Sequence, residues 1–101
     1  MIYLTMAIFV QEGKEAIFHQ FEDLALPLLA DYNGKLIYRL RPNAESYIGG
    51  EPEMPYELHV LSFESEADFA AFAQDERRKE FLHLKEASIR SSFLVKGALV
   101  G

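Results

Sequence analysis

Two hydrophobic periodicities alternate along this chain of 101 residues, and their order constrains the fold more than any other feature. Strand-like apolar runs are expected at 2–10, 35–41, 55–63 and 89–95, the last one running on toward Leu99. Apolar residues at helical spacing are expected at 13–32 and at 65–87, the latter in two segments that meet at Gln74 and Asp75. Two right-handed crossovers of this kind fold onto one antiparallel sheet, so the chain is predicted to form a single ferredoxin-like βαββαβ domain of the α+β class over residues 1–101.

Local signals fix where the expected elements end. Pro27 removes a backbone donor inside the first helix and predicts a break near Leu26. Asn33-Gly34 is typical of a left-handed helix end, and Ser65 with Asp68 three residues later is typical of a helix N-cap. Residues 43–54 are expected to form a loop that contains Gly and Pro. The buried stripe of the first helix is expected to consist of Ile17, Phe21, Leu24, Leu28 and Tyr32.

Composition and charge exclude several classes of partner. The net charge of −6 disfavours a phosphate backbone, and the one basic cluster, Arg77-Arg78-Lys79, is flanked by acidic residues, so no nucleic-acid partner is expected. There is no cysteine, which excludes disulfides and thiolate metal sites. The apolar start lacks the basic flank and cleavage site of a signal peptide and is too short to span a membrane, so a cytoplasmic protein is expected.

Two helices can cover only one face of a four-stranded sheet, and this predicts a homodimer. The residues expected to face the helices are Ile2, Leu4, Met6, Ile8, Leu36, Tyr38, Leu40, Leu58 and Val60. The residues expected on the uncovered face are Tyr3, Thr5, Ala7, Phe9, Ile37, Leu61 and Phe63. An apolar patch of that size is unusual on a soluble monomer, so two sheets are expected to pack face to face in a closed barrel.

Four stretches of the chain form a set: Phe21-Glu22 with Leu26-Pro27-Leu28-Leu29, Tyr32-Asn33-Gly34-Lys35-Leu36, Tyr38-Arg39-Leu40-Arg41-Pro42, and Phe63-Glu64-Ser65 leading into Phe69, Phe72 and Phe81. Together they resemble segments of the dimeric α/β-barrel superfamily, with the closest likeness to a family of small bacterial proteins of unknown function. Relatives in this superfamily include cofactor-free monooxygenases, muconolactone isomerase and haem-degrading enzymes. The resemblance implies a ligand cavity between sheet and helices, but the chain matches the catalytic set of none of these enzymes.

The strand at 55–63 carries an unusual pair, Glu57 and His59, on the same face as Leu61 and Phe63. Antiparallel pairing with 35–41 places Arg39 and Arg41 on that face too, within side-chain reach. One interpretation is a ligand-binding cluster, in which arginine holds an anionic substrate and His59 moves a proton. The other is an ion pair at the polar end of the sheet, with Glu57 and His59 side by side and not hydrogen-bonded. Tyr38 is expected to face the helices, where it either lines the ligand cavity or belongs to the core.

The sequence leaves the function open between two classes. The first is a homodimer that binds a small, largely apolar molecule, either as a simple binding protein or as a cofactor-independent enzyme of the monooxygenase or isomerase type. The alternative is a non-catalytic dimerisation or protein-interaction module. His19, His59 and His83 lie on three different elements without ligand spacing, so neither a metal nor another cofactor is expected. An enclosed pocket with converging polar groups would favour the first class.

Overall fold

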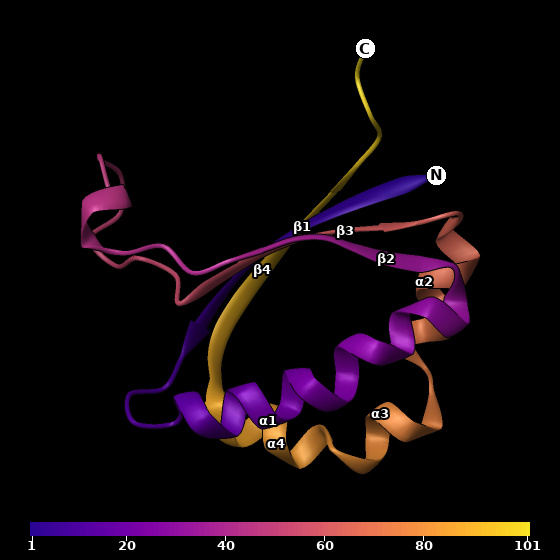
Figure 1. Cartoon of the computed structure of the whole chain (residues 1–101), viewed down its shortest axis with the longest axis horizontal. Coiled ribbons are helices and arrows are strands. Elements are labelled where there is room, and N and C mark those ends of the chain that lie inside the picture. Colours follow the sequence, from indigo (N-terminus) through magenta and orange to yellow (C-terminus); the bar gives the residue numbers. More distant parts are fainter.

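A computed structural model that describes residues 1–101 shows a sheet with all major helices on one side (Figure 1). The elements in chain order are β1 Ile2–Val10, α1 Glu15–Ala25, η1 Leu26–Tyr32, β2 Gly34–Leu40, η2 Ala44–Ser46, β3 Glu57–Phe63, α2 Glu66–Ala73, α3 Glu76–Glu80, α4 Leu82–Ser88 and β4 Ile89–Gly97. The strand order is β2-β3-β1-β4, and every neighbouring pair is antiparallel. This is the ferredoxin-like arrangement of the α+β class, as predicted from the alternation of periodicities.

The local end signals act as predicted. α1 stops at Ala25, and Pro27 lies in the first turn of the 3₁₀ helix η1 that follows. Asn33 ends η1 in the left-handed region with φ 55°. Ser65 Oγ accepts a hydrogen bond of 3.1 Å from the backbone N–H of Asp68 and caps α2. The expected helical region 75–87 contains one further break, at Phe81, between α3 and α4.

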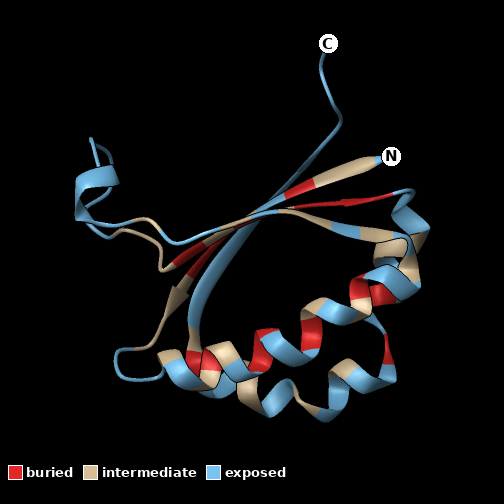
Figure 2. Cartoon of the chain, in the orientation of Figure 1, coloured by how far each residue is buried: buried red, intermediate tan, exposed pale blue.

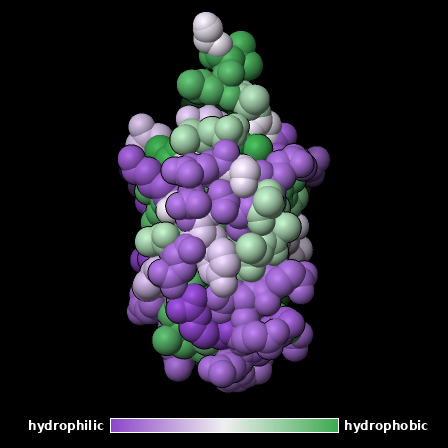
Figure 3. Space-filling view, turned by 90° about the vertical axis from the view of Figure 1, so that its right-hand side faces the viewer, coloured by the Kyte–Doolittle hydropathy of each residue, from purple (hydrophilic) through white to green (hydrophobic).

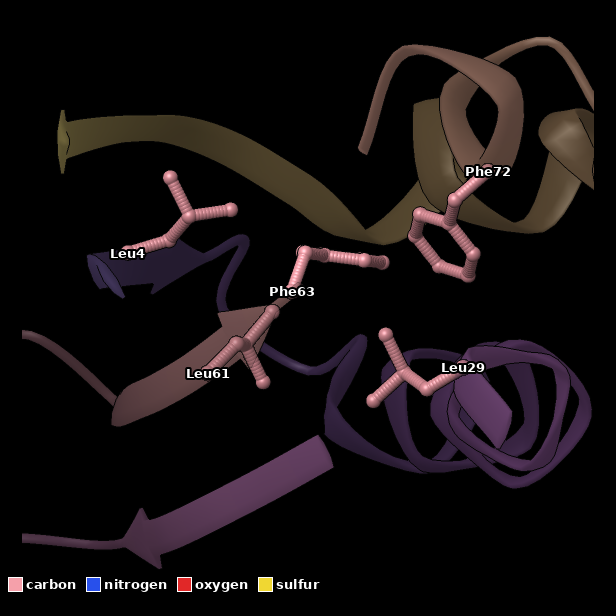
Figure 4. Packing of buried hydrophobic residues seen from close by; sticks show 5 residues of the cluster. All are labelled: Leu4, Leu29, Leu61, Phe63 and Phe72. Atoms are coloured by element: carbon pink, nitrogen blue, oxygen red, sulfur yellow. The ribbon is translucent and has the colours of Figure 1, made fainter. Parts of the chain in front are cut away.

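The prediction of which β3 residues face the helices is wrong. In the β1–β3 register Ile2 lies opposite Phe63 and Leu4 opposite Leu61, so these residues share the face that the helices cover. Leu58 and Val60 lie on the other face. The larger side chains take the covered face because the helices supply partners for them there. Five buried residues form this apolar core cluster (Figure 4): Leu4, Leu29, Leu61, Phe63 and Phe72.

A β-bulge in β2 explains a second correction. Leu36 pairs with Leu61 and Tyr38 pairs with Val60, so β2 has one extra residue, Ile37, at this point. Because successive side chains alternate between faces, one extra residue reverses the alternation. Leu36 therefore points toward the helices, whereas Tyr38 lies on the uncovered face and is 60% exposed. The expectation that Tyr38 and Leu40 face the helices is wrong.

The buried stripe of α1 also differs from the expected one. The buried apolar residues are Phe18, Phe21 and Ala25, continued by Leu29 of η1, while Leu24 is exposed. The stripe is rotated by about one residue, and this rotation brings Glu22 onto the buried face. In Figure 2 the buried parts of α1 and η1 face the interior below the sheet.

The helices leave one face of the sheet and most of β4 uncovered (Figure 2). The sequence leaves open whether Ser91 and Phe93 or Ser92 and Leu94 of the last strand face the helices. Ser92 pairs with Ile8 and Leu94 with Met6, so Ser92 and Leu94 lie on the helix side. Four apolar side chains on the open face are more than half exposed, namely Tyr38, Leu40, Phe93 and Val95. Beyond β4 the chain end carries exposed Leu99 and Val100 and projects from the body as an apolar segment (Figure 3).

Candidate functional site

Two polar residues of β3, Glu57 and His59, lie on the covered face, next to the apolar core cluster along the strand. Glu57 lies opposite Ile8 of β1, and His59 lies between Met6 of β1 and Arg39 of β2. The bulge at Ile37 places Arg39 on this side of the sheet. The sequence prediction that Arg39, Arg41, Glu57 and His59 share one face is therefore correct, although that face is the one under the helices.

Glu57 is the centre of this cluster. Its side chain is fully buried and accepts hydrogen bonds from Arg39 Nε, from Arg39 Nη2 at 3.3 Å and from Arg41 Nε at 3.4 Å. Burial by itself raises the pKa of this carboxyl, but the hydrogen bonds from His59 and Arg39 outweigh it and lower the pKa of Glu57 to about 2. Glu57 is consequently ionised at neutral pH and can act only as an acceptor.

His59 is held by Glu57, contrary to the expectation that the two are merely adjacent. The Nε2 atom of His59 lies 3.1 Å from Glu57 Oε1, and the imidazole is 2% exposed. Because an ionised carboxylate can only accept, the proton of this hydrogen bond resides on Nε2. Nδ1 makes no hydrogen bond to the protein, so it is available to give or take a proton on the side away from Glu57.

His59 opens onto a cavity of about 70 Å³ between the sheet and the helices, here called the inner cavity. Nine of its 14 lining residues are hydrophobic, and its polar lining residues are Glu22, His59, Arg78, Lys85 and Ser92. Glu22 is only 5% exposed, and its carboxylate makes no hydrogen bond to the protein. Burial raises the pKa of its carboxyl and the charge of Glu57 adds to this, while His59, Arg39 and Arg78 oppose the shift only in part.

Arg78 of α3 also lines the inner cavity and contains a buried atom without a partner. Its Nε atom is buried and has no hydrogen-bond acceptor, whereas Nη1 donates to the carbonyl of Ala73 at 3.2 Å. The guanidinium lies over the ring of Phe72, 4.7 Å from its centroid, which fixes its position. Desolvation lowers the pKa of Arg78, and the charge of Glu22 opposes this. Buried polar atoms are nearly always hydrogen-bonded, so Arg78 can take a further acceptor.

A larger hollow of about 260 Å³, here called the outer groove, lies where β2 and β3 leave the sheet. It is lined by Phe9, Val10, Arg41, Pro42, Glu53, Met54, Pro55 and Tyr56. Its polar groups are already paired: Arg41 with Glu57, Glu53 with Arg90, and the Tyr56 hydroxyl with His19 at 2.6 Å. The inner cavity, with its unpaired buried groups, is therefore the better candidate site.

Sequence reasoning brought four site residues together and missed two. Tyr38, expected to line the cavity, lies on the opposite face of the sheet and is not part of the cluster. Glu22 and Arg78 were missed because each lies in a segment with an ordinary solvated pattern. Positions 18, 22, 25 and 29 share one helix face. A buried stripe of α1 that started at Phe18 would therefore have predicted that Glu22 is buried. No group of three or more His, Asp or Glu side chains is placed to hold a metal ion.

Comparisons with known proteins support the fold. No protein-family model matches the chain, and no curated protein matches its sequence. Solved structures do: a protein of unknown function from Rhodopseudomonas palustris has a TM-score of 0.84 at 14% identity, over 99% of this chain and 82% of that one. An uncharacterised NIPSNAP domain protein from Burkholderia xenovorans has a TM-score of 0.72 at 11% identity, over 99% and 95%. A protein described as dimeric, of unknown function and ferredoxin-like fold, from Bacteroides fragilis, has a TM-score of 0.70 at 10% identity, over 97% and 95%.

At these identities the likeness concerns the fold alone. The neighbours are ferredoxin-like and NIPSNAP-like proteins without an assigned function. None of the helices in this chain combines the length and the apolar character that a membrane span needs.

Proposed function

We propose that this protein binds a small, largely apolar molecule in the inner cavity and that His59 exchanges a proton with it. One observation carries the proposal: Glu22 and His59, both almost fully buried, line the same cavity, and neither the Glu22 carboxylate nor Nδ1 of His59 makes a hydrogen bond to the protein. A buried polar group that lacks a partner costs about 1–3 kcal/mol, so a ligand that pairs with these groups would be bound favourably.

The cluster around Glu57 supports a role for His59 as general acid or base. Glu57 fixes the orientation of the ring and the tautomer, and its negative charge stabilises the imidazolium that forms when Nδ1 takes a proton. Arg39 keeps Glu57 ionised, so Glu57 itself does not exchange the proton. Glu22, whose pKa is raised, can supply or accept the second proton of an isomerisation. This chemistry moves protons only and needs no cofactor.

A second copy of the chain is proposed to cover the open face of the sheet. Tyr38, Leu40, Phe93 and Val95 are each more than half exposed there. Burying their exposed halves contributes about 3–6 kcal/mol gross per subunit, which across two subunits is comparable with an association cost of about 4–15 kcal/mol. The structural neighbour described as dimeric is consistent with this assembly. Phe93→Asp is expected to shift sedimentation toward the monomer at micromolar concentration, whereas Leu24→Asp, an exposed position on the helix side, is not.

Ligand binding is tested by a thermal-shift screen of small molecules against the wild type, Ala25→Leu and Ala16→Leu. Ala25 lines the inner cavity, so a larger side chain there fills it, while Ala16 is exposed on the same helix and serves as the matched control. A ligand present at about 100 times its Kd stabilises the native state by about 2.7 kcal/mol. The shift should persist in Ala16→Leu and disappear in Ala25→Leu.

The role of His59 is tested on the same hits with His59→Gln, which can still donate to Glu57. The variant should bind the hits more weakly. It should also lose the proton exchange with the ligand, which is measured as deuterium incorporation into the ligand. Hits that stabilise Ala25→Leu as strongly as the wild type would refute the inner cavity as the site. A screen without any hit, together with a stable dimer, would favour the alternative of a non-catalytic dimerisation module.

A further inference from the structure

We propose that the ligand of the inner cavity is a short monocarboxylate, held through its carboxylate by Arg78 and Lys85. This inference rests on the proposed function and adds the chemical class of the ligand. Its basis is the unpaired buried Nε of Arg78, the balance of charge around the cavity and the size of the cavity.

The first step concerns the acceptor that Arg78 lacks. The guanidinium is fixed over Phe72 and tied to the carbonyl of Ala73 through Nη1, so Nε has a set direction and no protein acceptor. Glu22 lines the same cavity but makes neither a hydrogen bond nor an ion pair with Arg78. An oxygen atom of a bound molecule is therefore the acceptor that the guanidinium of Arg78 can take, and a carboxylate makes the strongest such bond.

The charges around the cavity select a single negative charge. Arg39 and Glu57 neutralise one another in a hydrogen-bonded ion pair. Neither of them lines the cavity. Among the residues that do, Arg78 and Lys85 are cationic and in no ion pair, whereas Glu22 is the one acidic residue. The cavity thus keeps an excess of one positive charge when Glu22 is ionised and of two when it is protonated. A monoanion offsets this excess, and a cationic ligand would add to it.

The size and lining of the cavity limit the rest of the ligand. One water-sized atom needs about 10–15 Å³ of cavity volume, so the inner cavity of about 70 Å³ holds on the order of five non-hydrogen atoms. The mostly hydrophobic lining matches an apolar tail. Acetate, propionate and butyrate fit these limits, and hexanoate exceeds them. A ligand of about five atoms cannot bind more tightly than a low-micromolar Kd, so titrations must reach millimolar concentrations.

The test is a titration of the full chain at constant ionic strength. Binding is monitored by the NMR chemical shifts of the backbone amides of Ala25 and Ile89, two residues that line the cavity. The probes are acetate, propionate, butyrate and hexanoate, with propionamide as the neutral isostere of propionate. Propionate should bind at least tenfold more tightly than propionamide, and hexanoate should bind more weakly than butyrate. Chloride at the same concentration should not reproduce the shifts.

Variants separate the contribution of Arg78 from general electrostatics. Arg78→Met should weaken propionate at least tenfold and leave propionamide unchanged. Arg78→Lys keeps the charge and most of the packing, and it should give an intermediate Kd even where the methionine variant is unstable. Arg90→Met is the matched control, because Arg90 pairs with Glu53 and does not line the cavity.

The outcomes distinguish the two proposals. If propionamide binds as well as propionate and Ala25→Leu abolishes both, the cavity is a binding site but the carboxylate assignment is wrong. If Arg78→Met and Arg90→Met weaken propionate equally, Arg78 does not hold the carboxylate. If no carboxylate binds at tens of millimolar while a neutral hit of the wider screen does, this inference fails and the proposed function stands.

Discussion

Replacing Glu57 by glutamine is expected to destabilise the protein in a way that depends on pH. Glu57 is fully buried and accepts hydrogen bonds from Arg39, Arg41 and His59. Its folded-state pKa is about 2, below the ordinary value of 4.5. The difference of about 2.5 pH units corresponds to about 3 kcal/mol of stability at neutral pH, which agrees with the usual cost of about 3–5 kcal/mol for removing one partner of a buried ion pair.

The sign of the pH dependence follows from the lowered pKa. A carboxyl that is more acidic in the folded chain stabilises it above the pKa of the unfolded chain, and that contribution is lost as the pH falls through about 2. The wild type loses about 2 kcal/mol of this contribution between about pH 5.5 and pH 3, and Glu57→Gln, which has no carboxyl, does not. The stability gap between the two proteins should therefore narrow by that amount.

Urea unfolding at fixed protein concentration measures this gap at each pH. Glu53→Gln is the control, because Glu53 is mostly exposed and its ion pair with Arg90 should contribute less than about 1 kcal/mol at any pH. A gap between wild type and Glu57→Gln that is the same at pH 5.5 and pH 3 would show that Glu57 is not held ionised by Arg39 and His59.

Two further predictions concern the scaffold. Gly34→Ala should destabilise the fold by about 1–3 kcal/mol, because the added Cβ would lie 2.7 Å from a ring carbon of Phe63, whereas Gly49→Ala meets no atom within 4 Å and should be neutral. Thermal unfolding of the two variants measures the contrast. Tyr32→Phe should cost about 1.5 kcal/mol, since the Tyr32 hydroxyl donates to the buried carboxylate of Asp75. That loss should vanish in the background Asp75→Ala, which has no acceptor for the hydroxyl, if the hydrogen bond is its cause.

Much of the fold could be predicted from the sequence because its signals are local. The order of periodicities gave the topology, and Pro27, Asn33 and Ser65 marked helix ends whose geometry depends only on neighbouring residues. The shared face of Arg39 and Glu57 also followed from the period of two along a strand and antiparallel pairing.

The orientation of the strands could not be predicted, because it depends on tertiary contacts. In β3 both faces carry apolar residues, and the alternation is equally compatible with either face being covered. The aromatic rings of Phe69 and Phe72, which pack on Phe63 with centroids at 5.4 and 5.5 Å, decide the orientation. The bulge at Ile37 has no sequence signal, since the usual glycine of such irregularities is absent there.

The layer between the sheet and the helices is divided into two parts along β3, and this division separates the site from the scaffold. Leu61 and Phe63 belong to the apolar core cluster, whereas Glu57 and His59, on the same face, belong to the polar one. Replacing a whole buried ionic cluster by apolar side chains of similar volume is often neutral or stabilising, although removing one member is costly. Apolar residues at positions 39, 57 and 59 would therefore stabilise the fold at least as well as the polar ones do. The polar half of the layer is better explained by the inner cavity beside it than by the stability of the fold.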